Sequence, residues 1–311
     1  MQRHIFLGGL TAATLLGSAV LAEVPRVATD IAPVHSLVRQ VMGDLGEPDL
    51  ILPPGASPHG YSLRPSEARA LAGADVVFWV GEALAPWMEG VIASLSGGAV
   101  VVELLETEGT QTLPFREEAA FALRMPEDGG GGHDGHEGHD HSGADPHAWL
   151  DPQNMIAWTR AIATTLSAAD PENAATYAAN ADQATAELTT LTTRINERLT
   201  PVRGLSYVVF HDAYQYFETR FDMPAAGAIS LGDATDPGAA RVAAIRDLVR
   251  DQGVTCIATE PQFNPALVEA VAGGADLRTT ILDPLGTGLE PGAGFYDALI
   301  TALADGLLAC R

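Results

Sequence analysis

Residues 171–199 read P-E-N-A-A-T-Y-A-A-N-A-D-Q-A-T-A-E-L-T-T-L-T-T-R-I-N-E-R-L, a stretch rich in alanine and free of glycine. This composition predicts one helix of roughly 29 residues, which at 1.5 Å per residue extends over about 40 Å. A helix of that length spans a small domain. We therefore expect a rigid connection between two lobes, ending near Pro201.

The segments on either side of this helix alternate between strand and helix patterns. On the N-terminal side, a strand that runs into a helix is expected at 26–35, further strands at 49–54, 74–81 and 99–105, and helices at 65–72 and 86–95. On the C-terminal side, strands are expected at 205–210, 226–229, 254–259 and 279–282, with helices at 213–220, 237–252, 265–273 and 294–308. Such alternation predicts an α/β fold of two lobes, each a mainly parallel sheet flanked by helices. The expected division is an N-terminal lobe at 23–165, the connecting helix at 166–201 and a C-terminal lobe at 202–311.

The first 22 residues have the pattern of a secretory signal peptide. Arg3 and His4 precede an apolar run at 5–21, and cleavage is expected after Ala22. A membrane anchor is the alternative, but glycine, serine and threonine interrupt the run, which ends in the Val-Leu-Ala cleavage pattern. We expect a soluble protein that is exported to the periplasm.

The charge of the chain limits its partners. With 17 basic and 40 acidic residues the net charge is −23, which argues against nucleic acid or an anionic membrane and suits attraction of cations. An acidic surface is also an ordinary aid to solubility, and that interpretation stays open.

Cys256 and Cys310 are the two cysteines of the chain. In an exported protein, an even pair indicates one disulfide. The alternative, two thiolates that bind zinc, is less compatible with an oxidising compartment.

A histidine-rich stretch runs through residues 133–152, H-D-G-H-E-G-H-D-H-S-G-A-D-P-H-A-W-L-D-P. Neutral imidazole is the commonest metal ligand in proteins. We interpret the first half as a loop that collects metal weakly, and the segment 127–143 is predicted to be disordered without metal. A solvated spacer or an affinity tag is the alternative, although a tag would lie at a terminus. The expected weak ligands are His133, His136, His139 and His141.

A second set of residues has the spacing of one tight metal site. His59, His147, His211 and Asp283 lie in loops or at the ends of expected strands, where open α/β sheets place their ligands, and each half of the chain supplies two of them. Three imidazoles and one carboxylate suit tetrahedral zinc. Glu260 also follows a strand, and we expect it to orient a histidine instead of binding the metal.

These residues stand within motifs of a known family. In order, the motifs are G-A-S-P-H-G-Y-S-L-R-P-S (55–66), D-P-H-A-W-L-D-P (145–152), F-H-D-A-Y-Q-Y-F (210–217), T-E-P-Q-F (259–263) and L-D-P-L-G (282–286). Across the whole mature chain, this sequence resembles the zinc-specific solute-binding proteins of bacterial ABC transporters, the ZnuA-like group of the cluster A-I metal-binding receptors. Pro58 is a departure, because some zinc binders carry a glutamate there.

The resemblance implies a periplasmic receptor that binds one Zn²⁺ tightly between two α/β lobes joined by a long helix. His59, His147 and His211 would be metal ligands, and either Asp283 or water would complete the shell. The charged histidine-rich loop is similar to that of the zinc branch, and the cysteine pair is similar to the disulfide of Gram-negative zinc members. The implied partners are a membrane permease and its cytoplasmic ATPase, with a periplasmic metallochaperone kept open, and a monomer is expected.

Three other kinds of protein could also contain such residues. A manganese receptor stays open, because three histidines and one aspartate favour zinc without excluding manganese. A zinc hydrolase would need a coordination position for an activated water, and no H-E-x-x-H motif occurs. A metal-storage or adhesive surface protein would not need ligands from both lobes. We expect a transport receptor and no enzyme.

Overall fold

The computed structural model describes residues 23–116, 121, 143–230, 237–261 and 265–311, and it contains two four-stranded sheets in these ranges. The order in the N-terminal sheet is β2-β1-β3-β4, and the order in the C-terminal sheet is β6-β5-β7-β8. All paired neighbours are parallel. The predicted fold class of two parallel α/β lobes is therefore confirmed. The strands are β1 (Val27–Thr29), β2 (Asp49–Leu50), β3 (Val76–Trp79), β4 (Val100–Glu103), β5 (Tyr207–His211), β6 (Gly227–Ser230), β7 (Cys256–Thr259) and β8 (Arg278–Ile281).

Central strands are apolar because helices cover both faces of each sheet. Every residue of β3 and of β5 is buried. The α-helices of the described residues are α1 (Ala32–Met42), α2 (Pro65–Gly73), α3 (Pro86–Leu95), α4 (Pro152–Ala169), α5 (Ala174–Leu199), α6 (Gln215–Phe221), α7 (Ala239–Asp251), α8 (Pro265–Ala272) and α9 (Phe295–Ala309).

The connecting helix begins later than predicted. Helix α4, which the sequence pattern did not indicate, continues to Ala169, and the chain breaks at Asp170 before α5 begins at Ala174. Proline disfavours helical backbone in the residue before it, and Asp170 has φ −136° and ψ 80° in front of Pro171. Its carboxylate stabilises the break by accepting hydrogen bonds from Asn173 Nδ2 at 2.7 Å and Tyr177 Oη at 2.9 Å. The expected helix 166–201 is thus two helices, and 166–169 belongs to α4.

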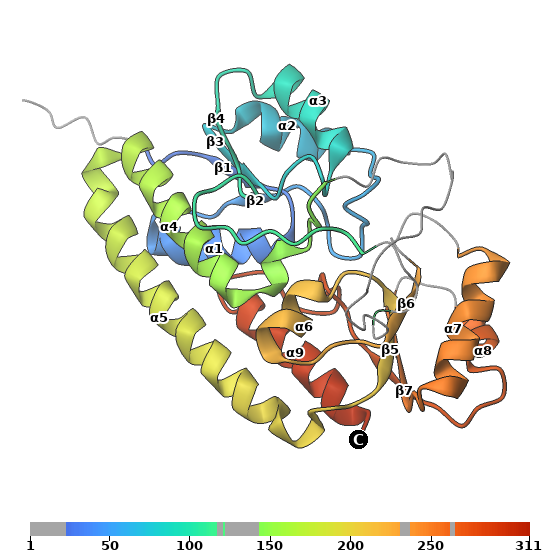
Figure 1. Ribbon diagram of the computed structural model, residues 1–311. Coiled ribbons are helices and arrows are strands. Elements are labelled where there is room, and N and C mark those ends of the chain that lie inside the picture. Colours follow the sequence, from blue (N-terminus) through green and yellow to red (C-terminus); the bar gives the residue numbers. More distant parts are fainter. Residues whose placement is uncertain (1–22, 117–120, 122–142, 231–236, 262–264) are drawn as a thin grey trace, which may run out of the picture.

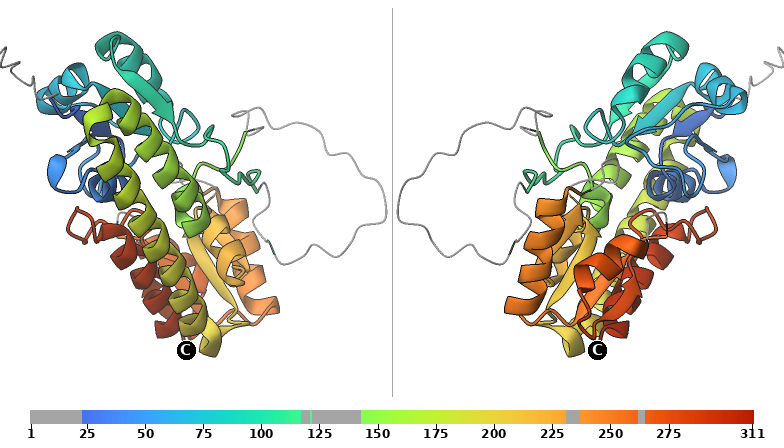
Figure 2. Two further views of the ribbon diagram at one scale, coloured as in Figure 1. Left: turned by 90° about the vertical axis from the view of Figure 1, so that its left-hand side faces the viewer. Right: turned by 90° about the vertical axis from the view of Figure 1, so that its right-hand side faces the viewer.

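Helix α5 runs along both lobes in Figures 1 and 2, with α4 beside it. Its buried face joins one hydrophobic core that extends from β1 to α9 and includes Val27, Trp149, Leu191 and Leu307. The two lobes are therefore joined by a shared core as well as by the chain. The shared core holds residues of both lobes in position relative to one another.

Cys256 of β7 and Cys310 after α9 form a disulfide, as predicted, which excludes the alternative of two zinc thiolates. The bridge closes a loop with a sequence separation of 54 and ties the last helix to the C-terminal sheet. In the chain-entropy model a loop of this size stabilises the fold by about 4 kcal/mol.

Two predicted segments fall outside the described residues: the signal peptide at 1–22, and the histidine-rich loop except for Gly143. Within the described part of the chain, none of the helices combines the length and apolar composition needed to cross a membrane.

Candidate metal site

The structure brings the three predicted histidine ligands together. His59 lies in a turn after β2, His147 lies just before the short helix Ala148–Leu150, and His211 is the last residue of β5. The ring of His147 lies near both other rings, with ring centroids 5.7 Å from His59 and 5.4 Å from His211. His147 and His211 are buried, with 4% and 2% of their surface exposed, and His59 is half-buried. Three segments that are distant in sequence thus bring imidazoles close together, and we call His59, His147 and His211 the histidine row.

Asp145 fixes the orientation of His147. Its Oδ1 lies 2.7 Å from Nδ1 of the His147 ring and accepts the backbone N–H of His147 at 3.0 Å. Burial raises the pKa of Asp145 to about 7, while the His147 N–H and the charge of Arg116 act in the opposite direction. An ionised carboxylate can only accept, so it favours the tautomer with the proton on Nδ1 and the lone pair on Nε2.

Glu260 plays the same part for His211. It follows β7, which neighbours β5 in the sheet, and its Oε1 lies 2.6 Å from Nδ1 of His211. Burial raises the pKa of Glu260, and the contact with His211 opposes that increase. Carboxylates that hold the far nitrogen of a ligating histidine are typical of metal sites. In both rings, Nε2 is the nitrogen that the carboxylate does not hold.

Asp283 lies two residues beyond β8 and is half-buried. Its Oδ1 accepts the backbone N–H groups of Leu285 at 2.9 Å and Gly286 at 3.0 Å, and its Oδ2 accepts that of Thr287 at 2.7 Å. The loop therefore holds this carboxylate in place. Its charge acts on buried Tyr214, whose pKa is raised first by burial and then by Glu260 and Asp283. Whether Asp283 binds metal stays a prediction.

The site is not a closed cage of ligands. Among the described residues, no group of three or more His, Cys, Asp or Glu side chains lies close enough to hold an ion as it stands. The four predicted weak ligands His133, His136, His139 and His141 fall outside the described residues.

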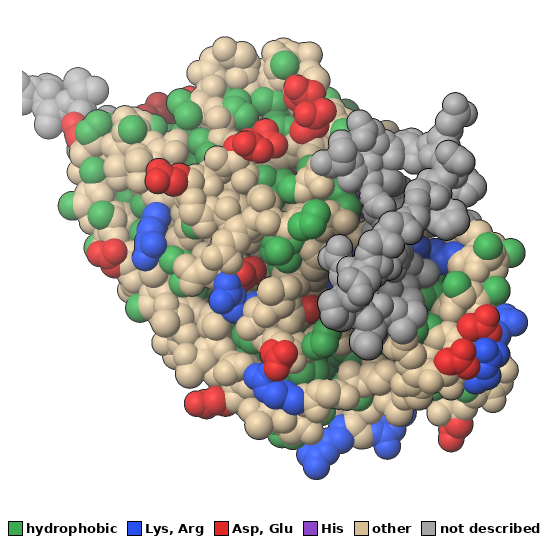
Figure 3. Space-filling model, viewed as in Figure 1, with side chains coloured by type: hydrophobic (Ala, Val, Ile, Leu, Met, Phe, Trp, Pro, Cys, Tyr) green, Lys and Arg blue, Asp and Glu red, His purple; other side chains and the backbone are tan. Residues whose placement is uncertain are grey.

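The acidic side chains on the face seen in Figure 3 are scattered and do not gather in one patch.

Sequence reasoning missed two residues beside the site. Asp145 stands two positions before His147, and the spacing D-x-H could have indicated a carboxylate that accepts from the same ring. Arg116 lies at the end of a stretch without periodicity, and no sequence signal connects it to Asp212 and Glu218, to which it is bound in the structure.

Comparison with known proteins indicates the function of the protein that carries these histidines. Residues 27–310 match the family described as "Zinc-uptake complex component A periplasmic". The chain belongs to this zinc-uptake family. The match confirms the resemblance that the five motifs indicated.

Relatives of this family are similar over nearly the full length. The "High-affinity zinc uptake system protein ZnuA" of Paracoccus denitrificans is 45% identical, and the match covers 97% of both chains. The protein of the same name from Brucella abortus is 41% identical over 98% of this chain and 97% of its own.

Solved structures at lower identity share the fold. A crystal structure of ZnuA has a TM-score of 0.73 at 22% identity and covers 91% of this chain and 99% of its own. Similarity at this identity shows the fold of the zinc-uptake family and does not assign ligands.

Proposed function

We propose that the protein is a zinc receptor that captures one Zn²⁺ between its lobes and delivers it to an ABC importer. His59, His147 and His211 supply three nitrogen ligands, and Asp283 or a water molecule supplies the fourth. Zinc is the cargo of the protein, so the site must release the ion as well as bind it.

The observation that carries this proposal is the spacing of the three rings. Imidazoles that share a tetrahedral zinc ion at Zn–N distances of about 2.0–2.1 Å have ring centroids roughly 5 Å apart. The two distances from His147, 5.7 and 5.4 Å, are close to that value. Small movements of side chains would therefore be enough to close the three rings on one ion.

The buried carboxylates explain why such a site would bind tightly. Asp145 and Glu260 direct Nε2 of His147 and His211 toward the row and increase the basicity of each ring. Their negative charges also lie within the low-dielectric interior, where attraction of a divalent cation is weakly screened. Neither carboxylate needs to contact the ion to have this effect.

Membership of the zinc-uptake family supports the following further parts of the proposal. The receptor acts in the periplasm of a Gram-negative bacterium after removal of residues 1–22, as a monomer, and hands zinc to a membrane permease driven by a cytoplasmic ATPase. A periplasmic metallochaperone is a further candidate partner. With Asp283 as the fourth ligand the shell is closed, which favours binding over catalysis, because a zinc hydrolase keeps one position open for water.

The test is a titration of the chelator-stripped chain from Glu23, with and without residues 129–143. We expect one tight zinc ion per chain in both, which excess manganese does not displace. Additional weak zinc equivalents are expected only when His133, His136, His139 and His141 are present. Competition calorimetry against a chelator measures both classes of site.

Either of two results would contradict the proposal. Manganese that binds as tightly as zinc would assign the protein to another metal. Loss of the tight site in the shortened chain would mean that the loop donates a ligand, and the shell described above would be wrong.

A further inference from the structure

A short segment of the N-terminal lobe crosses to the C-terminal lobe at the histidine row. We call residues 113–116 the strap. Leu113 donates its backbone N–H to the Tyr216 hydroxyl at 2.9 Å, and the carbonyl of Pro114 accepts from Gln215 Nε2 at 3.1 Å. Both partners belong to α6 of the C-terminal lobe. The strap is therefore attached to the helix that follows the His211 loop.

The strap also holds the loop that carries His147. The carbonyl of Leu113 accepts the backbone N–H of Asp145 at 2.8 Å, and Pro114 pairs with Ala144 as an isolated β-bridge. The Tyr216 hydroxyl donates to the carbonyl of Asp145 at 2.7 Å. Because Asp145 binds the His147 ring, the strap is one residue removed from that ring.

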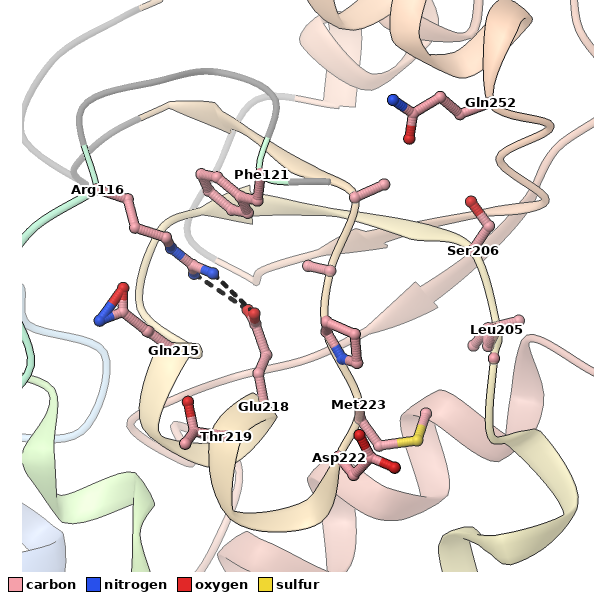
Figure 4. A pocket seen from close by; sticks show the side chains of 14 residues that line it. Arg116, Phe121, Leu205, Ser206, Gln215, Glu218, Thr219, Asp222, Met223 and Gln252 are labelled. Carbon is pink, nitrogen blue, oxygen red and sulfur yellow. Dashed lines mark hydrogen bonds and ion pairs between the residues drawn. The ribbon is translucent and has the colours of Figure 1, made fainter. Parts of the chain in front are cut away.

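Arg116 connects the strap to the loop that carries His211. Its Nε donates to both carboxylate oxygens of Asp212 at 2.9 and 3.0 Å, and its terminal nitrogens donate to Glu218 at 2.8 and 3.1 Å. Figure 4 shows the guanidinium directed at Glu218, with the ring of Phe121 beside it. The guanidinium carbon lies 3.6 Å from the Phe121 ring centroid.

The Arg116 contacts are largely shielded from water. Asp212 and Glu218 side chains are 6% and 5% exposed, and that of Arg116 is 20% exposed. A guanidinium that binds two carboxylates in a fixed fork cannot be replaced in this geometry by a single ammonium. Asp212 directly follows His211, so the fork holds the residue next to this histidine at the end of β5.

The geometry points to Arg116 as a positioning residue that sets the distance between His147 and His211 and thereby the zinc affinity of the site. Leu113 and Tyr216 bind the backbone of Asp145, whose carboxylate contacts the His147 ring. Arg116 binds Asp212, the residue that follows His211. The inference rests on the metal role proposed above for the two histidines. It adds a residue that contacts neither ring and that the zinc-binding motifs do not contain.

The test compares zinc binding by the full mature chain with that of Arg116→Gln and Arg116→Lys. We expect Arg116→Gln to weaken zinc binding by about tenfold or more, the range seen when supporting groups of metal ligands are removed. Arg116→Lys keeps the charge but not the fork, so we expect a smaller loss. The absorption spectrum of the Co²⁺-loaded protein should also change in Arg116→Gln, because the spectrum reports the geometry of the ligands.

Arg220→Gln is the matched control. Arg220 forms a similar two-bond pair with Asp151 at 2.6 and 2.7 Å, between α6 and the N-terminus of α4, but it does not hold a residue next to a histidine ligand. We expect it to lower the melting temperature of the metal-free protein while zinc affinity stays within about twofold of the parent.

Two outcomes would show that the inference is wrong. In the first, Arg116→Gln binds zinc as the parent does while His147→Ala and His211→Ala bind it weakly. In the second, Arg220→Gln weakens zinc binding as much as Arg116→Gln does. If the two histidine variants themselves bind zinc normally, the proposed function fails instead. Should Arg116→Gln not fold, Arg116→Lys and Tyr216→Phe take its place, and normal binding by both contradicts the inference.

Discussion

Replacing His211 by alanine is expected to weaken zinc binding by more than about 100-fold, which corresponds to more than about 2.7 kcal/mol. The substitution removes a nitrogen ligand and also leaves Glu260, whose side chain is 1% exposed, without the ring that it binds. His147→Ala should have a similar effect, because its partner Asp145 is also buried. His59→Ala is expected to have a smaller effect, since this ring is half-buried whereas the other two are buried.

Glu260→Gln separates the two contributions to that loss. The amide oxygen can still accept the Nδ1–H of His211, but the negative charge is gone, and we expect about tenfold weaker binding. Chelator competition measures each affinity. His35→Ala is the control, because this histidine is buried in α1 against the carbonyl of Pro48 and lies outside the row. If His35→Ala weakened zinc binding as much as His211→Ala, the row would not be the site.

Trp149→Ala is expected to lower the free energy of unfolding by about 3–5 kcal/mol and to weaken zinc binding as well. The side chain is fully buried, and its indole N–H donates to the carbonyl of Pro284 at 2.9 Å across the lobe boundary. Its own carbonyl accepts from the hydroxyl of Tyr296 at 2.8 Å. The indole also lies 5.2 Å from the His147 ring, centroid to centroid, so the cavity left by the substitution would loosen that ligand.

Trp158→Ala provides the comparison for this substitution. Trp158 is equally buried, and its indole N–H donates to Thr110 Oγ1 at 3.0 Å within the N-terminal lobe. We expect chemical denaturation to show a similar loss of stability for both variants, and chelator competition to show weaker zinc binding only for Trp149→Ala. Equal zinc affinities in the two variants would contradict the role given to Trp149 at the lobe boundary.

Much of the fold could be predicted because several of its strands lie in short apolar runs. The run that contains β3 is a clear case, since all four residues of the strand are buried beneath helices. The helical pattern at 171–199 agrees with α5, whereas the wider range 166–201 runs across the break at Asp170, because the effect of Pro171 on the residue before it is local. Helix α4 was not predicted, although it begins with Pro152 at its first turn and Asp151 as its N-cap.

The histidines were predictable from their motifs, but the residues around them were less so. Glu260 was expected beside a histidine because it follows a strand, whereas Asp145 was not, and the structure shows each carboxylate at the Nδ1 atom of a ring. Arg116 is 96 residues away from Asp212, and only the folded chain brings them together. Long-range ion pairs of this kind leave no periodic trace in a single sequence.

The central claim is that histidines from three loops share one zinc ion. The most direct measurement is the X-ray absorption fine structure at the zinc edge, recorded with one zinc equivalent on the chain that lacks residues 129–143. We expect three imidazole nitrogens and one oxygen at about 2.0–2.2 Å from the zinc ion. A shell with fewer than two imidazoles, or one dominated by oxygen ligands, would contradict it.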